Sequence, residues 1–166
     1  MDNDLLPDLC DAYEDKILWL PVTWQDYGGK SVFSGQIVTL RCFEDNSLVR
    51  DILSRPGKGK VLVIDGHGSV NRALLGDQLA LLAVQNEWQG IVVYGAVRDV
   101  VTLSGLNLGV KALGVCPLKT LKRQSGEENV MLSFADCRIF PGDHLYADQN
   151  GIIVTPHPLP NNIVEQ

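Results

Sequence analysis

Residues 60–65 read KVLVID, and residues 76–99 read GDQLALLAVQNEWQGIVVYGAVRD. The first stretch is apolar, rich in β-branched residues and followed by glycines, which predicts a buried strand. The second opens at Gly76-Asp77 with apolar residues on one helical face, which predicts a helix that ends near Trp88. Residues 91–94 (IVVY) predict a second strand. Together these stretches predict a β-α-β unit and an α/β fold.

The lengths of these elements predict which side chains meet. A helix of about 11 residues travels roughly 16 Å, and a strand of about five residues returns a similar distance. A single crossover helix implies parallel strands, so the start of the helix at Asp77 should lie at the same sheet edge as Arg98-Asp99. In open α/β sheets this carboxyl edge is where ligands bind.

The residues expected at that edge suit a small anion held with a metal. The N–H groups of Gln78 and Leu79, at the positive end of the helix dipole, can receive a carboxylate. Arg98 offers a planar fork of donors to a carboxylate or carbonyl oxygen. Asp99 is a hard oxygen ligand, and one carboxylate with waters and substrate oxygens is a normal set for Mg²⁺. Asp77 would orient a bound water.

Each of these residues also has an ordinary structural interpretation. Aspartate is among the commonest helix N-caps, so Asp77 alone is explained as a cap. The Arg98-Asp99 pair alone is explained as a solvated charge pair. Only the predicted convergence of all three at one edge favours a functional site.

Length and composition predict a single domain that spans residues 1–166. The chain is 45% hydrophobic and 20% charged, which is sufficient for one buried core. A net charge of −6 argues against direct nucleic-acid binding, which normally requires a basic surface. Two short basic segments, 55–60 (RPGKGK) and 119–123 (KTLKR), are interpreted as solvated loop charge.

The expected location is the cytoplasm, without a membrane partner. Met1 is followed by Asp2, Asn3 and Asp4, so the sequence shows no secretory signal. The longest apolar runs are too short to span a bilayer. Four cysteines without metal-ligand or redox spacing are expected to be buried free thiols: Cys10, Cys42, Cys116 and Cys137.

Outside the central unit, the pattern predicts further helices and strands. The expected helices are residues 7–13 and 48–53. The expected strands are one or two within residues 31–43, a short one within 106–115, a pair at 131–134 and 137–140, and one at 151–155. Strands dominate the second half, which predicts a mixed sheet, and residues 156–166 are expected to form a loose tail. His67 and His144 are expected in loops, with His67 the better candidate for the site.

Four long segments resemble the family named for the regulator of ribonuclease activity A (RraA), which also contains metal-dependent 4-hydroxy-4-methyl-2-oxoglutarate aldolases. These segments are 43–47 (FEDNS), 61–77 (VLVIDGHGSVNRALLGD), 86–100 (NEWQGIVVYGAVRDV) and 142–154 (GDHLYADQNGIIV). The resemblance implies a compact α/β/α sandwich of the swivelling β/β/α type that assembles as a homotrimer.

The same resemblance assigns roles to the candidate residues. The aldolase pattern of an Asp, twenty residues and then Arg-Asp matches Asp77, Arg98 and Asp99. It implies that Gly76, Asp77, Gln78 and Leu79 hold the substrate, that Arg98 binds it, and that Asp99 ligates a divalent cation, Mg²⁺ or Mn²⁺.

The implied chemistry is that of a class II pyruvate aldolase acting on a small 2-keto acid. The metal would chelate the carboxylate and keto oxygens, and C–C cleavage would leave a pyruvate enolate that the metal and Arg98 stabilise. Oxaloacetate decarboxylation passes through the same enolate, so one site could catalyse both reactions.

Three features distinguish this chain from the aldolase pattern. The acid expected shortly after Arg-Asp is absent, since Thr102, Leu103 and Ser104 occupy those positions. A neighbouring subunit could supply one instead, from residues 127–128 (EE) or from Asp143.

The other two features are His67, which replaces a glycine of the usual triple-glycine turn, and segments such as CFEDNS that resemble the regulator branch. The alternative function is therefore a non-catalytic regulator that binds and inhibits ribonuclease E.

Overall fold

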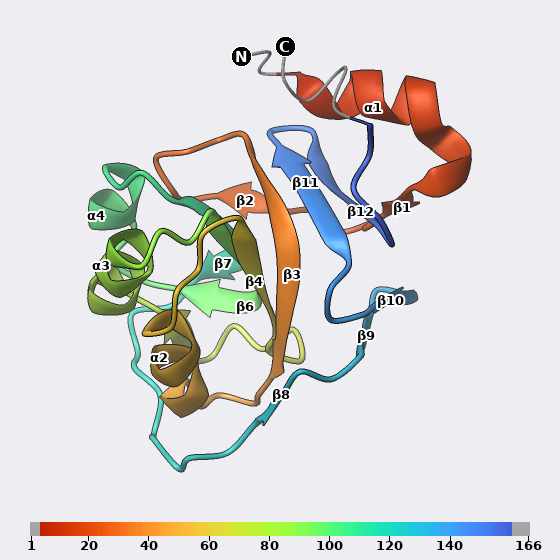
Figure 1. Cartoon of the computed structure of the whole chain (residues 1–166). Helices are drawn as coiled ribbons and strands as arrows, with labels where there is room; N and C mark the ends of the chain where they lie inside the picture. The colour runs from red at the N-terminus through yellow and green to blue at the C-terminus, as the bar shows by residue number, and fades with distance from the viewer. Residues whose placement is uncertain (1–3, 161–166) are drawn as a thin grey trace.

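A computed structural model describes residues 4–160 of the chain, and most of its strands join one mixed sheet of ten strands. The main strand order is β1-β12-β11-β3-β4-β6-β7-β2, while β5 pairs with β6 and β8 pairs with β3 (Figure 1). The strands of this sheet are β1 (Leu18–Trp19), β2 (Gln25–Asp26), β3 (Phe33–Arg41), β4 (Lys60–Asp65), β5 (Ala73–Leu75), β6 (Gly90–Val97), β7 (Gly109–Val115), β8 (Glu127–Glu128), β11 (His144–Asp148) and β12 (Gly151–Thr155). The predicted α/β class with a mixed sheet is confirmed.

The predicted β-α-β unit is confirmed at the centre of the molecule. Strand β4 covers the expected residues, helix α3 (Asp77–Gln85) begins at the expected Asp77, and β4 pairs with β6 in parallel. The helix ends three residues before Trp88, and β6 extends from Gly90 to Val97, beyond the predicted 91–94. Strands β3 and β7 also run parallel to their neighbours β4 and β6.

Helices cover one face of the parallel strands (Figure 1). They are α2 (Ser47–Leu53), α3 and α4 (Val100–Ser104), whereas α1 (Leu5–Tyr13), followed by the short 3-10 helix η1 (Glu14–Lys16), packs on β11 and β12. None of the helices within residues 4–160 is long and apolar enough to cross a membrane.

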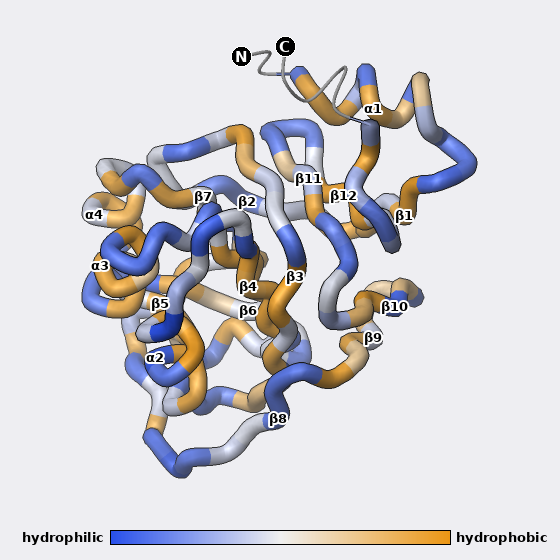
Figure 2. The backbone as a smooth tube through the Cα atoms, viewed as in Figure 1, coloured by the Kyte–Doolittle hydropathy of each residue, from blue (hydrophilic) through white to orange (hydrophobic). Residues whose placement is uncertain are grey.

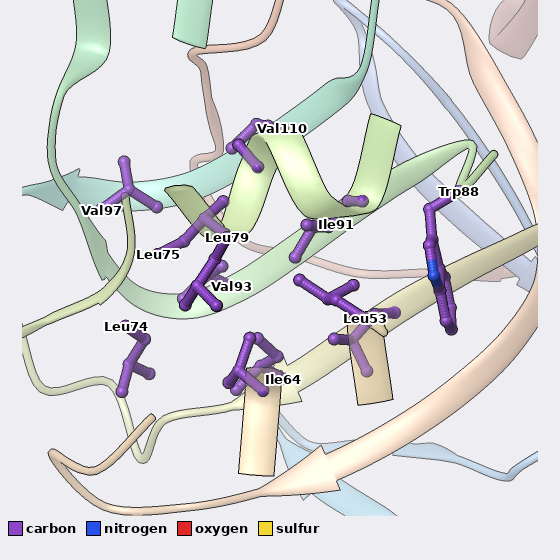
Figure 3. Close-up of a cluster of buried hydrophobic side chains, with 14 of the residues drawn as sticks. Leu53, Ile64, Leu74, Leu75, Leu79, Trp88, Ile91, Val93, Val97 and Val110 are labelled. Atoms are coloured by element: carbon purple, nitrogen blue, oxygen red, sulfur yellow. The ribbon is translucent and has the colours of Figure 1, made fainter. Parts of the chain in front are cut away.

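Alternating side chains of the central strands form two cores on opposite faces of the sheet. Leu62 and Ile64 of β4 face the helices, whereas Val61 and Val63 face the second core. Figure 3 shows Leu53 and Leu79 from the helices beside Ile91 and Val93 of β6. The second core includes a hairpin of β9 (Leu132–Phe134) and β10 (Cys137–Ile139), the strand pair expected in this region. Figure 2 shows the apolar central strands and the largely hydrophilic connection from β7 to β8.

The main error of the sequence interpretation concerns His144, which was expected in a loop. It begins β11, where it pairs with Gln36 of β3 and Thr155 of β12. The glycine and aspartate before it suggested a turn, but the alternation of the following residues is satisfied by two strands that are distant in sequence. Strands β1, β2, β5 and β8 and helix α4 were also not predicted.

Part of the predicted loose tail is packed. Leu159 is 4% exposed within the cluster that joins α1 to β11 and β12, and its N–H donates to the Tyr146 hydroxyl at 2.8 Å. Residues 161–166 of that prediction lie outside the described part of the chain. The four cysteines are free thiols, and three of them are buried, close to the expectation.

Two glycines are required where β6 and β7 pair beside Phe33. Gly90 and Gly109 are register partners, and a Cβ added at Gly109 would lie 2.1 Å from Cδ1 of the buried Phe33 ring. We therefore expect Gly109→Ala to lower the free energy of unfolding by about 1–3 kcal/mol through overpacking. Urea denaturation measures this change. Gly105→Ala is the matched control, because its nearest neighbour is an oxygen 3.7 Å away, and an equal effect of both substitutions would contradict the packing argument.

Candidate active site

A short strand that the sequence did not reveal places the two halves of the candidate site side by side. Strand β5 pairs with β6 in parallel, with Leu75 in register with Val97. The N–H of Arg98 donates to the Leu75 carbonyl at 2.9 Å. Gly76 follows β5 and Arg98 follows β6, so the start of α3 and the Arg98-Asp99 pair lie together at the carboxyl edge of the sheet, as the spacing predicted.

Asp99 is connected directly to the start of α3. Its Oδ2 accepts the N–H of Asp77 at 2.9 Å, so this carboxylate satisfies one of the free amide groups of the helix start. Asp99 has a φ of 60°, in the left-handed region that aspartate tolerates better than most residues.

Gly76 permits this close approach. A Cβ at position 76 would lie 2.7 Å from Oδ2 of Asp99 and 3.4 Å from Nε of Arg98. Any larger residue would therefore push the carboxylate and the guanidinium away from the helix start. Gly76 is thus required for the contact between Asp99 and the helix start, while its predicted role in holding the substrate stays a prediction.

Arg98 is partly held by protein groups. Its Nε lies 4.0 Å from Oδ2 of Asp99, and its Nη1 donates to the Pro117 carbonyl at 3.4 Å. Both are long contacts, and the side chain is 39% exposed. The guanidinium therefore keeps donors available for a ligand in the adjacent pocket.

The predicted amide donors of α3 differ from each other. The N–H of Gln78 donates to the Asp77 carboxylate at 2.8 Å, so Asp77 acts as a local acceptor at the start of its own helix. The N–H of Leu79 donates to no group within residues 4–160. A ligand carboxylate could therefore accept the free N–H of Leu79. To accept the N–H of Gln78 as well, it would have to displace the Asp77 carboxylate.

These groups border a pocket of about 230 Å³. It is lined by Asn46, Arg50, Ala73, Gly76, Asp77, Gln78, Leu79, Arg98, Lys119, Thr120 and Lys122. Five of the predicted site residues are among them, whereas Asp99 does not line the pocket and is linked to it through the Asp77 N–H. Sequence reasoning missed Asn46 and Arg50, and it assigned Lys119 and Lys122 to a solvated loop.

Asn46 joins the loop after β7 to the start of α2. Its Oδ1 accepts a hydrogen bond from the Thr120 hydroxyl at 2.7 Å and another from Lys122 Nζ at 3.1 Å. Its Nδ2 donates to the carbonyl of Leu74 in β5 at 3.3 Å. Asn46 therefore links the start of α2, the loop after β7 and strand β5 around the pocket. The only sequence signal for it was its position in the FEDNS motif.

The buried Asp45 anchors the same loop. Its carboxylate accepts the Arg123 N–H at 2.9 Å, the Ser125 N–H at 3.1 Å, and the N–H and hydroxyl of Ser47. Burial alone would raise the pKa of this carboxyl, but these hydrogen bonds outweigh burial and hold the pKa well below its ordinary value. Asp45 is therefore ionised at neutral pH and holds the loop at Arg123, directly after Lys122, and at Ser125.

The residues present fit a metal bound through one protein carboxylate. Within residues 4–160, no cluster of three or more histidine, cysteine or acidic side chains could hold an ion. Oδ2 of Asp99 is occupied by the Asp77 N–H, which leaves Oδ1 for a cation whose other ligands are waters and substrate oxygens. This arrangement suits Mg²⁺ or Mn²⁺ better than a zinc site with several side-chain ligands.

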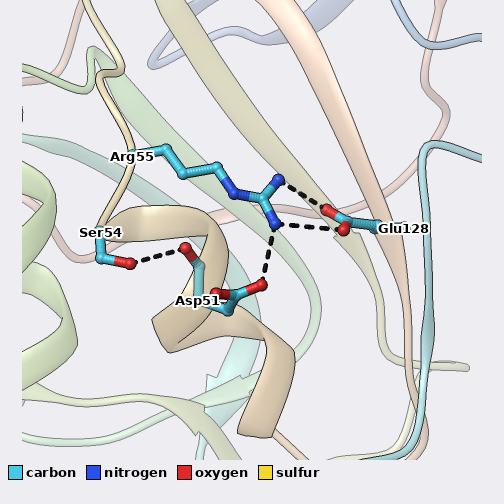
Figure 4. Close-up of polar contacts among 4 residues, drawn as sticks. All are labelled: Asp51, Ser54, Arg55 and Glu128. Carbon is cyan, nitrogen blue, oxygen red and sulfur yellow. Dashed lines mark hydrogen bonds and ion pairs between the residues drawn. The ribbon is translucent and has the colours of Figure 1, made fainter.

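The carboxylates considered as helpers are engaged elsewhere within their own chain. Glu128 forms a two-bond ion pair with Arg55, which also contacts Asp51 (Figure 4). Glu127 pairs with Arg41 at 2.9 Å, and Asp143 accepts the Phe140 N–H. The contribution of any of them to a neighbouring subunit stays a prediction.

The two histidines considered for the site do not line the pocket. His67 has a φ of 59°, donates its N–H to Asp65 and contacts the Phe43 ring edge-on. His144 lies on β11, where burial lowers its pKa.

Fold and site together define an α/β protein with a small cationic pocket at the carboxyl edge of its parallel strands. The Aldolase/RraA family model, described as RraA-like, matches residues 6–154, so the chain belongs to this family.

The chain is similar to curated proteins along nearly its whole length. It is 66% identical over 157 residues to a Photobacterium profundum protein named "Putative 4-hydroxy-4-methyl-2-oxoglutarate aldolase", covering 95% of this chain and 96% of the relative. A Vibrio cholerae protein of the same name is 56% identical over 153 residues, covering 92% and 95%.

Two solved structures share the fold. The RNA-processing inhibitor RraA from Thermus thermophilis is 41% identical with a TM-score of 0.90, covering 94% of each chain. A Geobacillus kaustophilus protein described as an S-adenosylmethionine:2-dimethylmenaquinone methyltransferase is 42% identical with a TM-score of 0.91, covering 93% of this chain and 96% of that one.

The Asp45 anchor gives a prediction for stability and its pH dependence. Asp45→Ala leaves several buried donors unsatisfied, so we expect it to lower the free energy of unfolding at pH 7 by about 1–3 kcal/mol. The folded-state pKa is depressed, so the stabilisation is present above the unfolded pKa of about 3.9 and is lost as the pH falls toward the folded value. Urea denaturation at pH 7 and pH 3 should show a smaller difference between the two proteins in acid.

The control is Asp51→Ala, which removes an exposed carboxylate from a surface ion pair and should change stability little. A difference between Asp45→Ala and the unsubstituted protein that widens at pH 3 would contradict the proposed role of the ionised carboxyl.

Proposed function

We propose that this protein is a divalent-metal-dependent lyase that cleaves 4-hydroxy-4-methyl-2-oxoglutarate to pyruvate. The observation that carries the proposal is the convergence of Arg98 and the start of α3 on a small cationic pocket, with the Asp99 carboxylate hydrogen-bonded to the Asp77 N–H beside it. The names of the curated relatives support the same reaction class.

The pocket residues suggest how the substrate would be bound. Arg98 would bind the carboxylate next to the keto group, and the Leu79 N–H at the start of α3 would add a second donor. Asp99 would hold the cation through Oδ1 while its Oδ2 keeps the bond to Asp77. A divalent cation bound there supplies Lewis-acid polarisation of the keto group.

Cleavage requires the 4-hydroxyl proton to leave as the bond between C3 and C4 breaks. C4 becomes the keto carbon of one pyruvate, and the electron pair remains on the other half as a pyruvate enolate. Arg98 faces the developing negative charge. Water oriented by Asp77 would accept the hydroxyl proton and return a proton to C3.

Oxaloacetate decarboxylation is a second reaction proposed for the same residues. Loss of CO₂ breaks a C–C bond to the carbon next to the keto group and leaves the same pyruvate enolate. Arg98 would then serve both reactions in the same way, with no additional group required.

Substitutions at Asp99 separate its structural role from its metal-binding role. Asp99→Asn keeps an oxygen that can accept the Asp77 N–H but loses the charge that a divalent cation requires, whereas Asp99→Ala loses both. We expect both variants and Arg98→Ala to lower kcat/KM for pyruvate release by about 100-fold or more. Chelation of the metal should abolish turnover. We expect Asp99→Asn to retain more of its melting temperature than Asp99→Ala.

A coupled assay of pyruvate release, with and without added Mg²⁺ or Mn²⁺, measures these rates. Lys58→Ala is a suitable control, because Lys58 is exposed and precedes β4, at the opposite edge of the sheet. Unchanged rates in the Asp99 and Arg98 variants would sink the lyase proposal.

We also propose a homotrimer, supported by apolar side chains exposed near the end of β7. Val115 and Leu118 are 51% and 53% exposed, and the partly exposed Val70 would lie 3.9 Å from a Cβ at Gly114. Such a surface is typical of a contact between protein chains.

The second candidate function is binding and inhibition of ribonuclease E. It is supported by the similarity to the RNA-processing inhibitor and by a surface hollow of about 220 Å³. This hollow is lined by Phe43, Glu44, Arg72, Leu121 and Arg123, and Phe43 is 60% exposed. Aromatic and arginine side chains are frequent anchors of protein interfaces.

If this hollow binds ribonuclease E, we expect Phe43→Ala to weaken the complex about tenfold or more by removing the aromatic anchor. A titration of purified ribonuclease E measures the affinity. Trp19→Ala is the matched control, since Trp19 is equally exposed but lies on the edge strand β1, which β12 and β11 separate from β3. Absence of binding by the unsubstituted protein at micromolar concentrations would count against this function.

A further inference from the structure

The candidate pocket holds more positive charge than a simple keto acid requires. Four cationic side chains line it, Arg50, Arg98, Lys119 and Lys122, while Asp77 is the one carboxylate among its lining residues. In the proposed function Arg98 binds the carboxylate beside the keto group. Lys122 contacts the neutral Oδ1 of Asn46. Arg50 and Lys119 therefore remain to be explained.

Arg50 and Lys119 have no ion-pair partner in the part of the chain that is described, whereas some of the other cations of this protein are paired. Arg41, Arg55 and the buried Lys111 each pair with a carboxylate at 2.8 or 2.9 Å. Two unpaired cations on the walls of one small pocket would repel each other. An anionic ligand relieves this repulsion.

Both side chains are presented to the pocket by ordered backbone. Arg50 lies four residues after Asn46, one turn further along the same face of α2. The backbone of Lys119 forms an isolated parallel β-bridge with Ala73, and the Lys119 carbonyl accepts a hydrogen bond from the Arg72 side chain at 3.2 Å. The two cations thus come from different elements. Arg50 belongs to α2, which begins directly after Asn46, and Lys119 belongs to the loop after β7, which is bonded to Asn46 through Thr120.

We infer that Arg50 and Lys119 form a second anion subsite that selects 2-keto acids carrying a distal carboxylate. This inference rests on the proposed function, because Arg98 must bind the first carboxylate. The pocket of about 230 Å³ is smaller than the roughly 300–1,000 Å³ of drug-sized sites, which suits a short dicarboxylate. A ligand with a methyl group in place of the second carboxylate leaves both cations uncompensated.

Two ligands of equal chain length test the inference without turnover. 2-Oxoglutarate carries the distal carboxylate, whereas 2-oxopentanoate ends in a methyl group. Neither has a 4-hydroxyl, so retro-aldol cleavage cannot occur. Isothermal titration calorimetry of the full chain with Mg²⁺ at low salt gives the two affinities and their ratio.

We expect the unsubstituted protein to prefer 2-oxoglutarate by about tenfold or more, the effect of a charge-assisted contact. Arg50→Gln and Lys119→Gln should each lower this ratio, and the double substitution should bring it close to one. Arg50→Lys, which keeps the charge, should retain part of the preference. Lys58→Gln, outside the pocket, should keep the ratio of the unsubstituted protein.

The outcomes distinguish the two proposals. Equal affinity for both ligands in the unsubstituted protein, or a preference that survives the double substitution, would overturn the second subsite alone. Failure of both ligands to bind would instead overturn the proposed keto-acid site. Inorganic phosphate competing with 2-oxoglutarate but not with 2-oxopentanoate would support the subsite, because it would occupy only the region of Arg50 and Lys119.

Discussion

The parallel pairing of β5 with β6 determines the geometry of the candidate site. Leu75 and Val97 are in register, so the chain leaves both strands at the same level, at Gly76 and Arg98. The hydrogen bond between the Asp77 N–H and the Asp99 carboxylate then connects the segment after β5 with the segment after β6. A shift of this register by one residue would turn alternate side chains to the opposite face and separate the guanidinium from the helix start.

The groups at this junction satisfy one another, which explains how exposed charges are held in place. Asp99 caps α3 from outside the helix, Asp77 accepts the next amide, and Gly76 leaves the space that Asp99 needs. The left-handed conformation of Asp99 is compensated by its hydrogen bond and by the Leu103 N–H, which donates to its carbonyl at 2.9 Å. The cap and the candidate metal ligand are therefore one residue, and the two interpretations of its carboxylate are compatible.

The predictability of this structure depends on whether a signal is local. KVLVID and the helix after Asp77 carry their own periodicity, so β4, α3, β6 and their parallel order were predicted correctly. Strand β5 is only three residues long, between a loop and Gly76, and it exists because β6 continues past Gly95 to pair with it. The bond between Thr120 and Asn46 spans 74 residues, and no pattern near either residue indicates it. For the same reason the sequence did not predict that Arg50, Lys119 and Lys122 line one pocket.

An acidic protein can contain a cationic pocket because small and large anions respond to charge over different distances. At physiological ionic strength, exposed charges are screened beyond about 8 Å. A short dicarboxylate inside the pocket would therefore be affected mainly by Arg50, Arg98, Lys119 and Lys122. A nucleic-acid backbone would extend over a surface with a net charge of −6. The overall composition thus argues against a polyanion, while the local pocket favours a small anion.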